Sequence, residues 1–246
     1  MPIRQLEVRF LSGATALSGT LSVPATPGKD AGKHAAVAFV HGSGLTNRAY
    51  LPDLQALLLA NGVAVLAYDK RGVGQSGGTY PGESPTSETI DTLALDAAAA
   101  ARFLAAQPEI DPARVGLAGH SQAGWIIPLA ATREPTIQFV IVFAGPTVTA
   151  DEVDLFQTLS GQGKHPSALS DAAVDAQVLA HGPSGVDPIP WIKELTIPGL
   201  WVYGGRDRHV PPRLSEQRLR PIAARPGARF HDRNLPEREP RACRDP

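Results

Sequence analysis

The chain has 246 residues, of which 43% are hydrophobic and 19% charged, and this length and composition suit one α/β domain with a large core. The net charge of -1 gives no reason to expect nucleic acid or a membrane surface as a partner, and no apolar run approaches the roughly 20 residues of a membrane helix. The single cysteine excludes an internal disulfide and a zinc-binding cysteine pair, and residues 1–7 turn charged where a signal peptide would be apolar. We therefore expect a soluble, cytoplasmic, single-domain protein.

Hydrophobic periodicity predicts strands that alternate with helices along most of the chain. An antiparallel pair comes first, followed by short apolar runs that are typical of strands buried on both faces. The predicted strands are Leu6–Phe10, Leu17–Val23, Ala35–Val40, Val63–Tyr68, Val115–Ala118, Phe139–Ala144 and Leu200–Tyr203, and the predicted helices are Leu51–Asn61, Ser87–Gln107, Ala123–Thr132 and Pro211–Ala224. This order indicates a doubly wound, mostly parallel sheet, which binds ligands beyond the carboxyl ends of its strands.

The run Gly119-His120-Ser121-Gln122-Ala123-Gly124 lies between a predicted strand and a predicted helix. A serine flanked by small residues in this context is typical of a nucleophile elbow, G-x-S-x-G in form, although Ala123 replaces the last glycine. The turn would present the Ser121 hydroxyl at the start of a helix, whose dipole favours developing negative charge. The alternative is a glycine-rich helix start with a capping serine.

The strand Ala35–Val40 continues into His41-Gly42-Ser43-Gly44. A loop with so little side-chain bulk allows backbone N–H groups to face a carbonyl oxygen as it becomes an oxyanion. We predict that the N–H groups of Ser43 and Gln122 are these donors. An ordinary glycine-rich turn with a hydrogen-bonded His41 is the alternative.

Acidic residues follow two further strands. Asp69, together with Arg71, reads as structural, bracing loops through hydrogen bonds and an ion pair. Asp207 follows the late strand Leu200–Tyr203, where an acid placed after the serine in chain order is expected to orient a histidine. The alternative for Asp207 is a solvated turn residue paired with Arg206 or Arg208.

Together these four strand-end motifs resemble the α/β-hydrolase fold, most of all the bacterial serine hydrolases related to prolyl oligopeptidases and dienelactone hydrolases. The likeness runs from about Leu6 to Pro226. It implies a Ser–Asp–His hydrolase of esters or related acyl compounds that needs no metal or organic cofactor, with Ser121 as nucleophile and Asp207 as the acid. Dienelactone hydrolases proper use cysteine, so the serine at 121 departs from them.

The segment between Ala144 and Pro198 is too long for a plain connection and has helical spacing. Members of this family often carry a helical cap there, so we expect a short cap insertion at about 146–190 of a domain spanning 1–225. The cap would determine which small-molecule acyl substrates bind. An aminopeptidase or an acyl thioesterase of the same fold is the alternative to an esterase. The oligomeric state is not defined by these motifs.

The general base is the missing part of the predicted triad. His209 lies too close to Asp207 in the chain to bridge to Ser121, and His231 falls where a last strand, not a strand-end loop, is expected. Residues 213–246 hold nine arginines, no lysine and five acids, and residues 226–246 show no periodicity. We therefore predict an irregular tail at 226–246 with no regular final strand, and no histidine placed between Ser121 and Asp207.

One explanation for this tail is a shifted reading frame, because GC-rich DNA read out of frame favours arginine, proline and alanine. Back-translation of Ala228–Pro246, read one nucleotide later, allows the string RDFTIATFPNANHALVET. It contains an alternating strand and a histidine loop, with the histidine drawn from the codons of Pro240 and Arg241. The alternative explanation for the tail is a disordered basic segment. Because the triad histidine is not found, the alternative function is a catalytically impaired protein that binds an acyl ligand.

Overall fold

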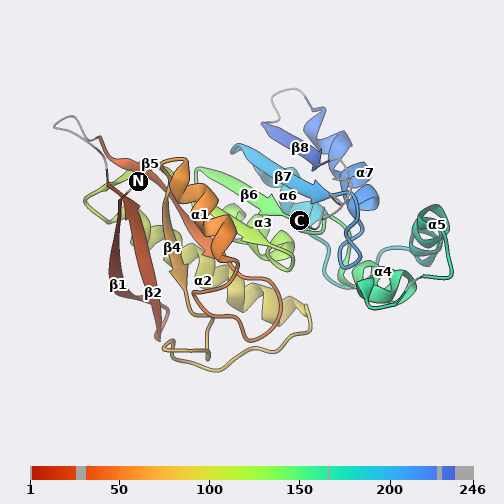
Figure 1. Cartoon of the computed structure of the whole chain (residues 1–246), viewed down its shortest axis with the longest axis horizontal. Helices are drawn as coiled ribbons and strands as arrows, with labels where there is room; N and C mark the ends of the chain where they lie inside the picture. The colour runs from red at the N-terminus through yellow and green to blue at the C-terminus, as the bar shows by residue number, and fades with distance from the viewer. Residues whose placement is uncertain (1, 26–31, 166, 226–228, 236–246) are drawn as a thin grey trace, which may run out of the picture.

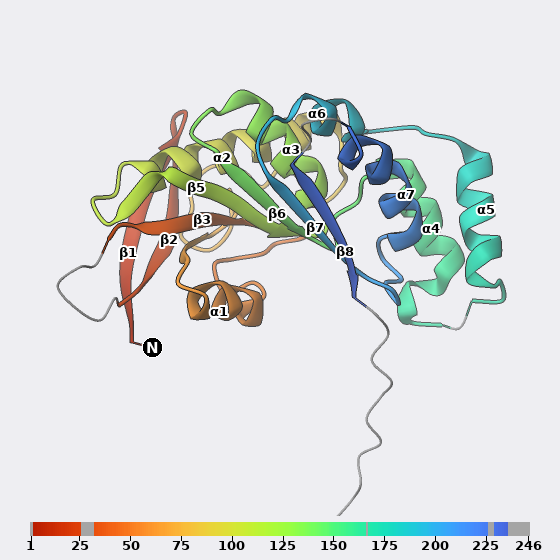
Figure 2. The same ribbon diagram turned by 90° about the horizontal axis from the view of Figure 1, so that it is seen from above.

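The structure, a computed structural model, describes residues 2–25, 32–165, 167–225 and 229–235. Eight strands form one sheet in the order β1-β2-β4-β3-β5-β6-β7-β8 (Figures 1 and 2). Their bounds are β1 Ile3–Ser12, β2 Thr15–Pro24, β3 His34–Val40, β4 Ala64–Tyr68, β5 Ile110–His120, β6 Phe139–Phe143, β7 Gly199–Gly204 and β8 Phe230–Leu235. β2 pairs antiparallel with β1 and β4, and the other pairings are parallel, which confirms a mostly parallel, doubly wound sheet.

Helices cover both faces of this sheet. They are α1 Pro52–Ala60, α2 Ser87–Ala105, α3 Ala123–Arg133, α4 Ala150–Ser160, α5 Asp171–His181, α6 Ile189–Glu194 and α7 Pro212–Ala223, with a 3-10 turn η1 at Gly161–Gly163. Figure 2 shows α1 on one face of the sheet and α2, α3 and α6 on the other. In the part of the chain that the structure describes, no helix is both long enough and apolar enough to cross a membrane.

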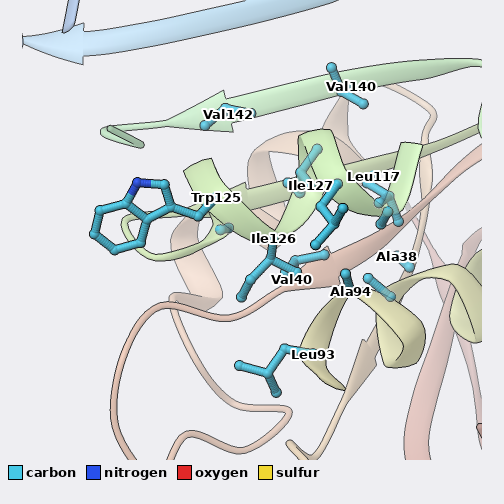
Figure 3. Packing of buried hydrophobic residues seen from close by; sticks show 14 of the residues in the cluster. Ala38, Val40, Leu93, Ala94, Leu117, Trp125, Ile126, Ile127, Val140 and Val142 are labelled. Carbon is cyan, nitrogen blue, oxygen red and sulfur yellow. The ribbon is translucent and has the colours of Figure 1, made fainter. Parts of the chain in front are cut away.

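The larger core lies between the sheet and the helices α2 and α3. Figure 3 shows Ile126 and Ile127 of α3 beside Val40, Leu117 and Val140 of the strands. The run Ala97–Ala101 of α2 is almost completely buried, because small side chains allow this helix to approach its neighbours closely. A smaller core on the opposite face joins Val37, Phe39 and Val65 of the sheet to Leu58 and Leu59 of α1.

The prediction that no regular final strand follows residue 228 is wrong. β8 pairs in parallel with β7, from Gly199 opposite Phe230 to Gly204 opposite Leu235. Phe230 is buried and its ring packs edge-to-face on Trp201, with 5.6 Å between the ring centroids. An edge strand needs backbone pairing on one side only, so a sequence without apolar alternation still forms it once Phe230 anchors its start. The predicted irregular and frame-shifted region otherwise falls on 226–228 and 236–246, outside the described residues.

The long connection between β6 and β7 carries α4, α5 and α6 (Figure 1). A capping box begins α4, in which the N–H of Thr149 donates to Glu152 at 2.8 Å. Val153 and Asp154 of α4 line a cavity together with Ser121. The helical spacing predicted in this connection is therefore confirmed at α4 and α5, and α4 contributes to the surroundings of Ser121.

Candidate active site

Ser121 occupies a sharp turn between β5, which ends at His120, and α3, which begins at Ala123. Its φ of 57° lies in the left-handed region, which costs free energy for a residue other than glycine. The N–H of Ser121 still donates to the carbonyl of Phe143 at 3.0 Å, so the turn stays attached to the neighbouring strand. Ser121 lies at the predicted strand-to-helix turn.

The turn is possible because the residues around it are small. A Cβ placed on Gly119 would lie 2.6 Å from Cβ of Ala123 and 2.7 Å from the carbonyl oxygen of Val40. Such distances are too short for real side-chain atoms, so a larger residue at 119 would force the strand and the helix apart. The local sequence therefore dictates where the Ser121 side chain can lie.

The loop after β3 runs directly beside Ser121. A Cβ placed on Gly42 would clash with the Tyr50 hydroxyl and would lie 3.4 Å from Cβ of Ser121. Ser43 lines two cavities, and Ser121 lines the same two. Within the described residues, neither the N–H of Ser43 nor the N–H of Gln122 donates to another protein group. Both N–H groups predicted as oxyanion donors thus lie near Ser121, with no hydrogen-bond acceptor among the described residues.

His41, in the same loop, is a buried structural residue. Its Nε2 donates to the carbonyl of Tyr68, and its side chain packs edge-to-face on the Tyr68 ring. Burial, with a smaller contribution from the Lys70 charge, lowers the pKa of His41 to about 3. His41 is therefore neutral at physiological pH and braces the loop, as the alternative sequence interpretation expected.

Asp207 follows β7 and faces the same space as Ser121. A cavity of about 490 Å³ is lined by Ser43, Tyr50, His120, Ser121, Ala144, Gln157, Asp207, His209 and Val210. Oδ1 of Asp207 accepts from the backbone N–H groups of His209 at 2.7 Å and Val210 at 3.0 Å. Arg208 pairs instead with Asp171 at 2.6 Å. The structure thus brings Ser121 and Asp207 to one cavity, although β6 separates their strands.

Two histidines line this cavity, and sequence reasoning assigned a role to neither. His120 is held by Tyr50, whose hydroxyl lies 2.9 Å from its Nδ1. Burial lowers the pKa of His120, while the nearby Asp207 carboxylate opposes that shift. Within the described residues, neither His120 nor His209 hydrogen-bonds to both Ser121 and Asp207. In the sequence, only the position of His120 next to Ser121 points to a place in the site. His209 is set aside as a triad base because it lies only two residues from Asp207 in the chain.

His231 lies at the wrong end of the sheet to complete a triad. It is the second residue of β8 and pairs with Leu200, whereas Asp207 follows the opposite end of β7. Four residues of parallel strand separate His231 from the carboxyl end of β8, a distance of about 13 Å. The backbone therefore keeps His231 away from the edge where Ser121 and Asp207 meet.

Asp69 and Arg71 are structural, as predicted, but they have different partners. Asp69 accepts from the Nε and Nη2 atoms of Arg48 at 3.1 and 2.9 Å, and also from the N–H of Gln75 at 2.9 Å. Arg71 donates from Nε to the buried Asp96 at 3.1 Å. These two ion pairs attach the loop after β4 to its surroundings.

A second cavity, of about 280 Å³, adjoins Ser121 on the side of α4. Glu83 and Asp154 line it, together with Gln122 and Trp125. Burial raises the pKa of Asp154, and the neighbouring Asp151 adds to the shift. Within the described residues, no group of three or more histidine, cysteine, aspartate or glutamate side chains is placed to hold a metal ion.

Comparisons with known proteins identify the family to which the chain is related. Residues 31–183, more than half of the chain, match the family described as serine aminopeptidase, S33. An uncharacterized protein of Mycobacterium tuberculosis is 31% identical over 73% of this chain and 55% of its own length. Esterase EstD of Thermotoga maritima is 27% identical over 85% of this chain and 54% of its own length. The chain spans about half the length of these curated relatives.

Solved structures support the same fold. The acetyl xylan esterase from Paenibacillus sp. R4 superposes with a TM-score of 0.63 at 16% identity, covering 97% of this chain and 84% of that one. The family match includes Ser43 and Ser121 but ends before Asp207. The sheet order, the turn at Ser121 and these matches together identify the chain as an α/β hydrolase that belongs to the serine aminopeptidase, S33, family.

Proposed function

We propose that this hydrolase cleaves carboxylic esters through an acyl intermediate on Ser121. The observation that carries the proposal is the left-handed backbone of Ser121 in a cavity shared with Ser43 and Asp207. Such strain at a strand-to-helix turn persists where it presents a side chain for chemistry. The similarity to an enzyme named as an esterase favours an ester substrate.

In the proposed mechanism, Oγ of Ser121 attacks the acyl carbon and its proton passes to a water molecule. The negative charge that forms on the acyl oxygen is stabilised by the N–H of Ser43, in the loop after β3, and by the N–H of Gln122, at the start of α3. Asp207 lies where it would orient an imidazole base in a complete triad. The alcohol then leaves with the proton, and water releases the acid from Ser121.

The general base is the catalytic group for which the described residues offer no well-placed side chain. Within the described residues, neither His120 nor His209 hydrogen-bonds to both Ser121 and Asp207, and the backbone of His231 lies near the start of β8, far from the carboxyl edge. We therefore propose that this chain is catalytically impaired: Ser121 attacks without a positioned base, so the rate lacks the roughly 10²–10⁴-fold that general base catalysis typically contributes. A shifted reading frame is the explanation that we propose for the lack of a triad histidine among the described side chains.

Hydrolysis of p-nitrophenyl acetate tests the proposal. We expect slow turnover that Ser121→Ala reduces further, because the nucleophile is lost. Ser184→Ala, an exposed serine outside the cavities, is the matched control and should retain the full rate. Equal rates in wild type and Ser121→Ala would mean that Ser121 is not the nucleophile, and binding of an acyl ligand without turnover would then be the better account.

A second candidate function is cleavage of aminoacyl compounds. The acidic residues Glu83 and Asp154 line the cavity next to Ser121, where their charges would attract the ammonium group of such a substrate. The family description, serine aminopeptidase, points in the same direction. An aminoacyl p-nitroanilide hydrolysed faster than its uncharged acyl analogue would favour this function.

A further inference from the structure

Lys70 is a buried lysine that the proposed mechanism does not use. It follows β4 and is only 1% exposed, although lysine almost always keeps its ammonium group in water. Asp69 and Arg71, its neighbours in the chain, are paired with Arg48 and Asp96. A buried charge is costly unless strong hydrogen bonds compensate it, so its partners indicate what it does.

The partners of Lys70 are two carbonyl groups of the loop beside Ser121. Its Nζ donates to the carbonyl of Gly42 at 2.6 Å and to that of Gly44 at 2.9 Å. Both bonds are charge-assisted and therefore stronger than those of a neutral donor. One ammonium group thus holds the carbonyls on both sides of Ser43.

The planarity of the peptide group carries this contact to the active site. The carbonyl of Gly42 and the N–H of Ser43 belong to one rigid trans peptide, so they point in opposite directions. Lys70 binds the carbonyl from the buried side, and Ser43 lines the cavity that contains Ser121. Rotation of this peptide would remove the N–H of Ser43 from the site.

We propose that Lys70 is the positioning residue of the oxyanion site: by holding the Gly42 and Gly44 carbonyls, it fixes the direction of the Ser43 N–H. This inference rests on the proposed function, in which that N–H binds the oxyanion. Lys70 does not touch the substrate in this arrangement. It acts through the peptide that joins Gly42 to Ser43.

The groups around Lys70 set the pH range in which it is charged. Burial lowers the pKa of Lys70 to about 8, and the Glu83 carboxylate opposes the shift. His41 faces it as a neutral ring, Asp69 precedes it in the chain, and the Tyr80 ring centroid lies 5.8 Å from Nζ. Lys70 is therefore mostly charged at pH 7 and loses its proton as the pH rises through about 8.

The first test is the rate at which a fluorophosphonate labels Ser121. Removing one oxyanion donor typically costs 10²–10³-fold in rate, so we expect Lys70→Met to label roughly 10²-fold more slowly at pH 7. Lys70→Arg should restore part of that rate, and Lys33→Met, at an exposed lysine, should label like wild type. Circular dichroism and the melting temperature establish that each variant is folded.

The pH profile distinguishes positioning from simple packing. The labelling rate of wild type should depart, near pH 8, from the profile of Lys70→Met, because only wild type loses the Lys70 charge there. If folded Lys70→Met labels as fast as wild type, Lys70 does not position the site. Without labelling of wild type itself, the proposed function fails and the next measurement decides the role of Lys70.

That measurement is the amide resonance of Ser43, followed by NMR between pH 6 and 10. It needs no catalysis. We expect an inflection near pH 8 in wild type that is absent in Lys70→Met and unchanged in Lys33→Met. A Ser43 amide without that inflection would overturn the link between Lys70 and this peptide.

Discussion

The hydroxyl of Tyr50 lies 2.9 Å from Nδ1 of His120, the residue that precedes Ser121. This contact joins the loop before α1 to the end of β5, although the two residues are 70 positions apart. The same Tyr50 hydroxyl leaves no room for a side chain at Gly42. His120 is thus held as part of the wall of the cavity.

We expect His120 to be a supporting residue rather than the general base. Burial lowers its pKa, so it is neutral at pH 7, but within the described residues it makes no hydrogen bond to Ser121. His120→Gln should therefore keep fluorophosphonate labelling within about tenfold of wild type. A loss near that of a general base, about 10²–10⁴-fold, would assign proton transfer to His120.

The ion pair between Asp69 and Arg48 should stabilise the fold. Asp69→Asn replaces a buried acceptor of four hydrogen bonds, and we expect the free energy of unfolding to fall by about 3 kcal/mol. Asp91→Asn, which removes an exposed pair with Arg133, is the matched control and should cost less than about 1 kcal/mol. Urea denaturation measures both, and equal effects would contradict the assignment.

The same pair gives a pH dependence of stability. Burial tends to raise the pKa of Asp69, but hydrogen bonds from Arg48 and Gln75 outweigh it, so the folded pKa is below the ordinary 3.8. The stabilisation is therefore present above the unfolded pKa and is lost as the pH falls through the folded pKa. The difference in urea midpoint between wild type and Asp69→Asn should shrink below pH 4 and stay constant from pH 5 to 7.

The acidic cavity beside Ser121 should influence substrate choice. Removing both carboxylates with Glu83→Gln and Asp154→Asn should lower kcat/KM for an aminoacyl ester by about tenfold, because charge attraction of roughly 1.4 kcal/mol is lost. An uncharged ester of similar size should change little. Glu194→Gln, at a residue outside this cavity, is the control and should leave kcat/KM unchanged for both substrates. An equal loss of kcat/KM for the charged and the uncharged ester would instead mean that the double substitution damages the site.

Restoring the shifted frame should raise activity. The six strand letters FTIATF of the alternative string fall on positions 230–235, the range of β8, and its histidine would follow the carboxyl end of that strand. General base catalysis typically contributes 10²–10⁴-fold, so ester hydrolysis should rise by at least about 10²-fold. Replacing the new histidine by alanine should abolish the gain. A restored protein no more active than this chain would refute the frame-shift hypothesis.

The strand-end loops could be predicted because their constraints are local. Apolar runs define β3, β5 and β7, and small residues around Ser121 permit only one kind of turn. The roles of Asp69 and Arg71 followed from their place after β4, but their partners Arg48 and Asp96 did not, because such pairs depend on how distant segments pack.

Other features depend on tertiary contacts that leave no periodic signal. β8 has a charged sequence, and its pairing with β7 comes from backbone hydrogen bonds and from the packing of Phe230 on Trp201. The burial of Lys70 likewise depends on Gly42 and Gly44, which are 28 and 26 positions away in the chain. Spacing within a motif carries no information about such contacts.

The central claim is that Ser121 is a nucleophile. The most direct measurement is mass spectrometry of the folded protein after treatment with a fluorophosphonate, with the modified peptide mapped. We predict one phosphonyl group per chain, located on Ser121 and absent in Ser121→Ala, with Ser184→Ala labelled like wild type. Folded wild type that stays unmodified, or that carries the group on another residue, would contradict the account.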